Sequence, residues 1–425
     1  MSDFIPMWRW MPSRPDSNRL AIAAKDGNMK TRLLTLFDIF KAPKSIRPGV
    51  YLYQSAPDAP VPQKMFLRVE PNGSSSLVVN ASLILHLNPV ATEFAYAFIN
   101  QVDEDTMIRN VMKKYRIDEE TLRHDFASFL DKLEAVTKTE DLDPFEFFGI
   151  ERATEQDLEN LSAPFRLDCA LTYRLPEDTS IVYAPVERVK KELSTDEWKS
   201  ILDKSWRAGI PHIIFTGGEP TLRSDLLDLI LHAEQNGQVC GLITDGHVFR
   251  NPNTVNDFLN AGLDHLMILL DAQSEESWQL IEKITPMDIF TTVHLTIYGE
   301  NASYLTQSIA RLASIGVNAL SLSASSPDFV SHINQASELA AYHGIKLVWD
   351  LPVPYSKFNP VRLEVIDEEL WEGSGKTWLY VEPDGDVLPG QGIPFLLGNL
   401  VSLEWEEIWT NCQDYGKNKA HLGVA

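Results

Sequence analysis

From residue 166 onward, short apolar runs alternate with amphipathic segments, and this alternation limits the folds that the chain can adopt. The apolar runs predict strands at LDCALTYR, HIIFTGG, CGLITDG, HLMILLDA, TTVHLTIYG, NALSLSAS and IKLVWDLPV. The segments between them predict helices, several of which begin with Ser, Thr or Asp and end with Gly. Units of about 25–30 residues in this order predict a parallel sheet with crossover helices, either an open wound sheet or a barrel. In both architectures, ligands bind at the carboxyl ends of the strands.

The regions on either side have different patterns. Three apolar runs precede three amphipathic segments between residues 50 and 136, which predicts a winged-helix-like α+β domain. One of its helices is expected to begin with Asn88 as N-cap and Pro89 at the first helical position. The predicted boundaries are an arm at 1–49, the α+β domain at 50–136, a linker at 137–165, the α/β barrel at 166–358 and a small α/β tail at 359–425.

Charge and hydropathy exclude some classes of function. The formal net charge is −23, and a surface so acidic repels phosphate backbones, so no nucleic-acid partner is expected. No apolar run reaches the length of a membrane span, and the first residues lack a signal-peptide pattern, which predicts a cytoplasmic protein. Residues 25–47 are basic, and two roles stay open for them: packing on the acidic body of the protein, or docking on a membrane surface or a partner.

The motif FTGGEPTL gives the clearest sign of chemistry. A predicted strand ends in Gly217 and Gly218, and Glu219 and Pro220 follow before the next helix. Glycines allow a ligand to approach the backbone, and the free carbonyls and amides at the strand end can hold an amino-acid head group, with Glu219 supplying charge. The alternative is an ordinary strand-to-helix turn that needs these residues for its shape.

The stretch from APFRLDCALTYR through IPHIIFTGGEPTLRSDLLDLI to LITDGH resembles radical S-adenosylmethionine (SAM) enzymes, with a tail similar to the SPASM or twitch extension. The resemblance covers roughly residues 163–410 and implies a partial (β/α)6 barrel. In that family, a loop of the form C-x-x-x-C-x-x-C holds a [4Fe–4S] cluster that chelates SAM. Here the three positions are Leu175, Thr179 and Val182. The resemblance makes Gly217–Pro220 a vestigial SAM site.

Cysteine content supports the loss of the cluster. The chain has three cysteines, Cys169, Cys240 and Cys412, which are far apart and form no C-x-x-C pair. We therefore expect neither a metal site nor an iron–sulfur cluster, and at most weak binding of SAM. We also expect the apolar side chains of Leu175 and Val182 to pack over the carboxyl ends of the strands.

The segment SLVVNASLILHLN and the helices after it resemble the PqqD-like peptide-recognition domain. The resemblance implies that a peptide adds as a strand beside residues 75–82 and packs on the third helix. The expected peptide-binding residues are Leu77, Val78, Val79 and Arg123. The condition for this mode of binding is an unpaired edge on that strand.

These observations lead to one prediction and two alternatives. The prediction is a pseudoenzyme without catalytic residues that binds a peptide or a partner protein during peptide or cofactor maturation. The first alternative is a non-radical SAM-dependent enzyme, for example a methyltransferase, that uses the Gly217–Pro220 cleft. The second alternative is a radical SAM enzyme with unusual cluster ligands.

Overall fold

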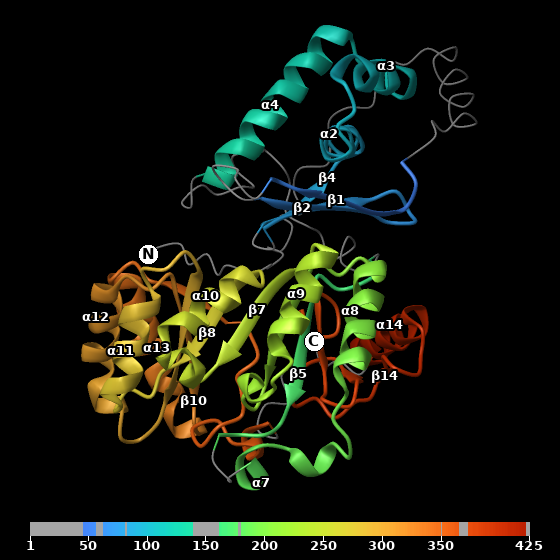
Figure 1. Cartoon of the computed structure of the whole chain (residues 1–425). Helices are drawn as coiled ribbons and strands as arrows, with labels where there is room; N and C mark the ends of the chain where they lie inside the picture. The colour runs from blue at the N-terminus through green and yellow to red at the C-terminus, as the bar shows by residue number, and fades with distance from the viewer. Residues whose placement is uncertain are drawn as a thin grey trace. The chain divides into compact units, whose positions relative to one another are not determined.

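A computed structural model describes residues 46–56, 63–80, 83–138, 161–176, 180–349, 351–364 and 373–421. These residues belong to two compact units, one before and one after residue 160, which are described separately (Figure 1). Most of the predicted arm and linker, and Thr179, lie outside the described residues. No helix in the described part of the chain is long and apolar enough to span a membrane.

The first unit contains an antiparallel sheet covered by helices. Its strands follow the order β1-β2-β3-β4 in space as in sequence. They are β1 (Gly49–Gln54), β2 (Lys64–Val69), β3 (Ser75–Val79) and β4 (Leu83–Leu87). The helices are α2 (Pro89–Ile99), α3 (Glu104–Lys114) and α4 (Glu119–Lys138). The prediction of three strands missed β4, whose apolar run LILHL directly precedes α2.

Local sequence explains how these helices begin and pack. The Asn88 side chain accepts hydrogen bonds from the backbone N–H groups of Val90 and Ala91, and Pro89 follows it, so the predicted cap is confirmed. The buried face of α4 joins α2, α3 and the sheet in one apolar core. It contributes Leu122, Phe126, Phe129 and Leu133 to that core.

The second unit contains a ten-stranded sheet of order β11-β10-β9-β8-β7-β6-β5-β12-β13-β14. Its strands are β5 (Arg166–Thr172), β6 (His212–Gly217), β7 (Val239–Thr244), β8 (Leu263–Leu269), β9 (Phe290–Ile297), β10 (Ala319–Ala324), β11 (Lys346–Val348), β12 (Trp378–Val381), β13 (Asp386–Leu388) and β14 (Gly398–Asn399). Strands β5 to β11 pair in parallel, in the order of the sequence. The predicted α/β fold with a parallel sheet is confirmed.

Helices connect the parallel strands, as in other β/α units. They are α7 (Ser180–Tyr183), α8 (Thr195–Ala208), α9 (Leu226–Asn236), α10 (Pro252–Asn260), α11 (Glu275–Ile284), α12 (Leu305–Ile315) and α13 (Val330–Tyr342), and α14 (Trp405–His421) follows the last strand. The tail extends the sheet, because β12 pairs in parallel with β5, and β13 pairs with β12 in antiparallel. The predicted turn at Asp384–Gly385 connects those two tail strands, with Gly385 at φ +88°.

Candidate functional site

The Gly-Gly-Glu-Pro motif lies at the carboxyl end of β6, as expected. A Cβ atom on Gly217 would stand 2.2 Å from the Thr172 carbonyl oxygen, and one on Gly218 would stand 2.3 Å from the Arg174 carbonyl oxygen. The Gly218 N–H donates to the Thr172 carbonyl at 2.8 Å. The chain's own backbone at the end of β5 therefore occupies the space that both glycines leave, and this packing accounts for them without a ligand. Pro220 is buried and begins a short 3-10 turn.

Glu219 is the centre of a buried hydrogen-bond network that connects the ends of β6 and β7. Its Oε1 accepts from the Thr221 N–H at 3.0 Å, the Thr221 hydroxyl at 2.5 Å and the Thr244 hydroxyl at 2.8 Å. Its Oε2 accepts from the Asp245 N–H at 2.8 Å. The residue is 2% exposed. Glu219 thus holds two strand ends together and keeps an acceptor position on Oε2.

Electrostatics make this carboxyl group unusual. Burial, and next the negative charge of Asp245, raise the pKa of Glu219 to about 8, while the hydrogen bonds from Thr221 and Asp245 act in the opposite direction. Two acidic side chains at adjacent strand ends, one of them buried, favour a cationic group over a neutral one. The arrangement can hold the ammonium group of an amino-acid head group.

A second polar cluster was missed by the sequence analysis. His294 of β9 is buried, with Nδ1 3.0 Å from the Ser321 hydroxyl and Nε2 3.1 Å and 3.0 Å from the hydroxyls of Thr296 and Ser323. Burial lowers the pKa of His294 to about 4, so its imidazole is neutral at neutral pH. The available signal was the polar alternation H-x-T and S-x-S in two strands whose intervening residues are apolar.

The loop after β5 does not close as predicted. Leu175 is half-buried and packs beside the Tyr173 cluster, and its N–H donates to the Ser180 hydroxyl at 2.7 Å. Val182 is 63% exposed and Ile181 is 69% exposed, because both lie on α7, a single turn without buried residues. The prediction that Leu175 and Val182 both pack over the strand ends is therefore wrong for Val182.

Beneath this loop, a buried network connects β5 to the tail. The Tyr173 hydroxyl donates to Glu382 Oε1 at 2.9 Å, and Arg188 reaches the same oxygen at 3.2 Å. Arg188 also donates to Glu364 at 2.7 Å, and the Tyr355 hydroxyl donates to Glu364. Burial raises the pKa of both carboxyl groups, and Arg188 opposes that shift. The network fixes the loop base against the tail.

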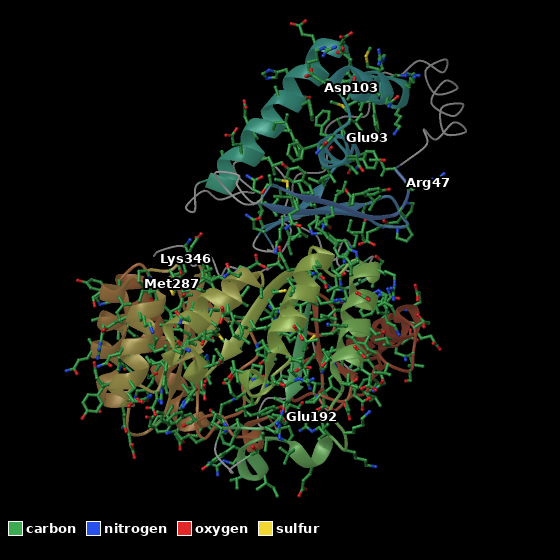
Figure 2. All side chains as sticks on the ribbon, viewed as in Figure 1. Arg47, Glu93, Asp103, Glu192, Met287 and Lys346 are labelled. Carbon is green, nitrogen blue, oxygen red and sulfur yellow. The ribbon has the colours of Figure 1, made fainter. Side chains whose placement is uncertain are left out.

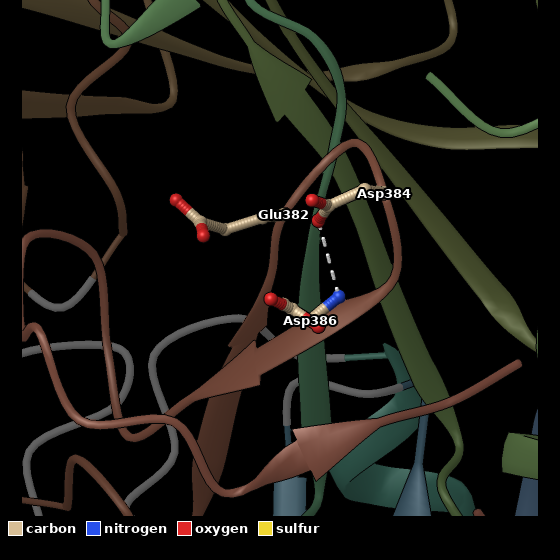
Figure 3. Close-up of side chains that lie close together, drawn as sticks. All are labelled: Glu382, Asp384 and Asp386. Carbon is tan, nitrogen blue, oxygen red and sulfur yellow. Dashed lines mark hydrogen bonds between the residues drawn. The ribbon is translucent and has the colours of Figure 1, made fainter. Parts of the chain in front are cut away.

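Three carboxyl groups in the tail, those of Glu382, Asp384 and Asp386, have oxygens within 4.8 Å of one another. Figure 3 shows that Glu382 points away from the other two, and that an Asp384 oxygen accepts from the Asp386 N–H. Asn399 donates to Asp386 at 2.8 Å. The grouping is accounted for by the hairpin turn and carries no evidence of a metal.

The donor set does not fit a cluster held by three cysteines of the loop. Leu175 and Val182 carry no metal-binding atom, and the three cysteines of the chain lie elsewhere and are all buried. They are Cys169 in β5, Cys240 in β7 and Cys412 in α14. Burial raises the pKa of the Cys169 and Cys412 thiols, which opposes formation of the ligating thiolate.

The expected peptide-binding residues are not brought together. Leu77, Val78 and Val79 are buried in β3, which pairs with β2 on one side and β4 on the other. The condition of an unpaired edge is therefore not met by β3, and β1 and β4 are the outer strands of the described sheet. Arg123 forms ion pairs with three carboxylates of α3 and α4.

Comparison with known proteins finds a family match within the second unit. The family model described as "Radical SAM superfamily" matches residues 169–318. A PqqA peptide cyclase of Bradyrhizobium diazoefficiens is 24% identical over 281 residues, which cover 60% of this chain and 72% of that relative. A PqqA peptide cyclase of Rhodopseudomonas palustris is 38% identical over 112 residues, covering 26% and 29%.

Solved structures agree on the fold. Streptococcus suis SuiB has a TM-score of 0.53 at 13% identity, with 81% of this chain and 86% of SuiB covered. SuiB bound to its precursor peptide SuiA has a TM-score of 0.52 at 11% identity, with 86% and 88% covered. SuiB bound to S-adenosylmethionine has a TM-score of 0.51 at 12% identity, with 81% and 86% covered.

Three predictions are contradicted by these findings. The curated relatives are named as cyclases, so the comparisons support an enzyme and overturn both the pseudoenzyme and the absence of catalysis. The prediction of no cofactor is contradicted as well, because the matching superfamily is the one for which the resemblance implies SAM and a [4Fe–4S] cluster, and SuiB has been crystallised with SAM. Residues 169–318 match the model of the radical SAM superfamily, and the second unit shares its α/β fold with SuiB.

Proposed function

We propose that this protein is a SAM-dependent enzyme that modifies a peptide during its maturation. The observation that carries the proposal is the match to a PqqA peptide cyclase over 72% of that relative's length. The site supports it, because the buried Glu219 carboxyl group follows β6 and the neutral His294 lies in β9 of the same parallel sheet. The first unit, which resembles a PqqD-like domain, recognises the peptide in this proposal.

Glu219 and Asp245 receive the ammonium group of SAM in this proposal. Oε2 of Glu219 has one partner, the Asp245 N–H, and its remaining lone pair can accept from an ammonium group. A cation at this position stabilises the ionised form of Glu219, whose pKa is about 8 without it. SAM, when bound, supplies an activated carbon–sulfur bond. Binding of SAM is therefore coupled to the loss of a proton from Glu219.

The His294 cluster orients the peptide in this proposal. Both ring nitrogens of His294 already contact hydroxyl groups, so the ring is held in one orientation. Because its pKa is about 4, the imidazole carries no charge at neutral pH, and in this proposal it holds the Ser321 and Ser323 hydroxyls that contact the peptide. The hydroxyls of Ser321 and Ser323 can rotate to donate or accept.

Calorimetric titration with SAM tests the first part of the proposal. The full chain is expected to bind SAM, and Glu219→Gln is expected to weaken binding about 10- to 100-fold, because a charge-assisted contact is lost. Glu338→Gln, on the exposed face of α13, is the matched control and is expected to bind like the unmodified chain. Equal binding by all three proteins, or no binding, contradicts the role of Glu219.

Mass spectrometry tests the second part. The chain, reconstituted anaerobically with iron and sulfide, is incubated with SAM and each short peptide encoded beside its gene, and a change in peptide mass is the expected result. Any iron that the protein retains must have ligands other than Leu175 and Val182, since neither side chain offers one. SAM binding without any change in peptide mass contradicts the enzymatic proposal and leaves the binding site intact.

A further inference from the structure

The first unit contains a cavity of about 650 Å³ between the start of β1 and the facing sides of α2 and α3. Arg47 precedes β1, Glu93 and Tyr96 come from α2, and Lys113 and Lys114 come from α3. Figure 2 labels Arg47 beside the sheet and Glu93 on α2. The cavity lies within one unit, at the β1 side of the sheet, and none of the peptide-binding residues expected from the sequence lines it.

The charge of the cavity is opposite to that of the chain. Arg47, Lys113 and Lys114 face one carboxylate, that of Glu93, which gives the lining a net charge of +2 in a chain of −23. Glu93 is already neutralised, because it contacts the Lys114 ammonium at 2.6 Å and its side chain is 9% exposed. Neither Arg47 nor Lys113 contacts a carboxylate among the described residues. Two cations therefore remain for an anionic ligand.

The remaining lining is mostly apolar, with Asn110 as a further polar side chain. The rings of Tyr51 and Tyr96 meet edge to face, with centroids 4.9 Å apart. The Tyr51 hydroxyl donates to the Arg47 carbonyl at 2.9 Å, which fixes the backbone just before β1. Met107 is buried below the cavity. Such a lining suits an apolar side chain next to a negative charge, and it does not suit a bare inorganic ion.

We propose that this cavity binds a segment of the substrate peptide in which a Glu or Asp residue stands next to an apolar or aromatic residue. The carboxylate contacts Arg47 and Lys113, and the apolar side chain lies on Tyr51 and Tyr96. This inference rests on the proposed function for its substrate class, because it assumes that the first unit recognises a peptide. Peptide binding in this cavity requires neither SAM nor Glu219. The experiments therefore distinguish a failure of this inference from a failure of the SAM-binding proposal.

Fluorescence anisotropy of the full chain with a labelled peptide, Leu-Glu-Phe-Leu-Glu blocked at both ends, tests the inference. The matched probe is Leu-Gln-Phe-Leu-Gln. The acidic peptide is expected to bind at least ten times more tightly than the amide peptide, and its affinity is expected to fall as salt is raised from 50 to 500 mM. Equal affinity of the two peptides, or no binding of the acidic peptide at millimolar concentration, overturns the proposal.

Substitutions inside and outside the cavity test where the acidic peptide binds. The double substitution Arg47→Gln with Lys113→Gln is expected to remove the preference for the acidic peptide, and Arg109→Gln, also on α3 but outside the cavity, is expected to keep it. A wild-type preference in the double variant overturns the assignment. Competition by inorganic phosphate at a lower concentration than by the acidic peptide also overturns it, since the site would then belong to a phosphate group. Glu219→Gln is expected to bind both peptides like the wild type.

Discussion

The stability of the second unit depends on the protonation of Glu219. Its pKa of about 8 lies above the ordinary value of 4.5, so the folded state holds a proton that the unfolded chain releases. For a carboxyl group shifted in this direction, stability is highest below the unfolded pKa and falls as the pH rises toward the folded pKa. Glu219→Gln removes the group that titrates. It also replaces the carboxyl oxygen that accepts from the Asp245 N–H with an amide NH2 group, which cannot accept.

The size of the effect follows from the shift. Between about pH 5 and pH 8, each pH unit costs the wild type about 1.4 kcal/mol through this group, or at most about 5 kcal/mol over the whole window. At pH 6, we expect Glu219→Gln to be about 1–3 kcal/mol less stable than the wild type, because a buried N–H loses its acceptor. By pH 7.5, that gap is expected to narrow by about 2 kcal/mol.

Urea unfolding followed by tryptophan fluorescence measures this difference. Residues 46–138 contain no tryptophan, and eight of the ten tryptophans lie between residues 198 and 409, so the signal follows the second unit. Glu338→Gln serves as the control for the loss of a carboxyl group from the surface. A stability gap between Glu219→Gln and the wild type that stays constant from pH 5.5 to pH 8 would refute the reasoning, because it would mean that Glu219 is ionised throughout.

Three further substitutions test other parts of the structure. Gly218→Ala is expected to cost several kcal/mol of stability, or to displace the loop after β5, because the new Cβ would stand 2.3 Å from the Arg174 carbonyl; a melting temperature within about 1 °C of the wild type contradicts this. Tyr173→Phe is expected to cost about 1–3 kcal/mol in urea unfolding, since buried Glu382 loses a donor. Asn88→Ala is expected to cost the first unit about 1 kcal/mol, measured as reduced amide-exchange protection in α2, and unchanged exchange argues against the cap.

The parallel strands were predictable because each is nearly continuous in apolar residues, and caps and glycines mark the helices between them. The pairing of Ser75–Val79 was not predictable in the same way. A single strand gives no information about its neighbours, and the apolar run Leu83–Leu87 that covers its second edge was not among the predicted strands. The strand that was expected to bind the peptide at its edge is therefore an interior strand of the sheet.

The candidate site shows the same division between local and long-range information. Glu219 could be identified from its motif, but its partners Thr244 and Asp245 belong to the next strand, and only the fold brings them together. Glycines that suggested an approaching ligand turned out to accommodate the chain's own backbone. His294 was missed because one sequence does not show which face of a strand points inward.

The parallel pairing of β12 with β5 has a consequence for synthesis. Arg166 faces Trp378 in this register, so the second neighbour of β5 is translated 212 residues after it. At ordinary translation rates, that delay is about 10–40 s. During this interval, one edge of β5 has its backbone groups free while the strands on its other side can already pair. The ribosome-bound chain therefore needs protection at this edge, and slowing translation between residues 360 and 380 is expected to increase aggregation of the nascent protein.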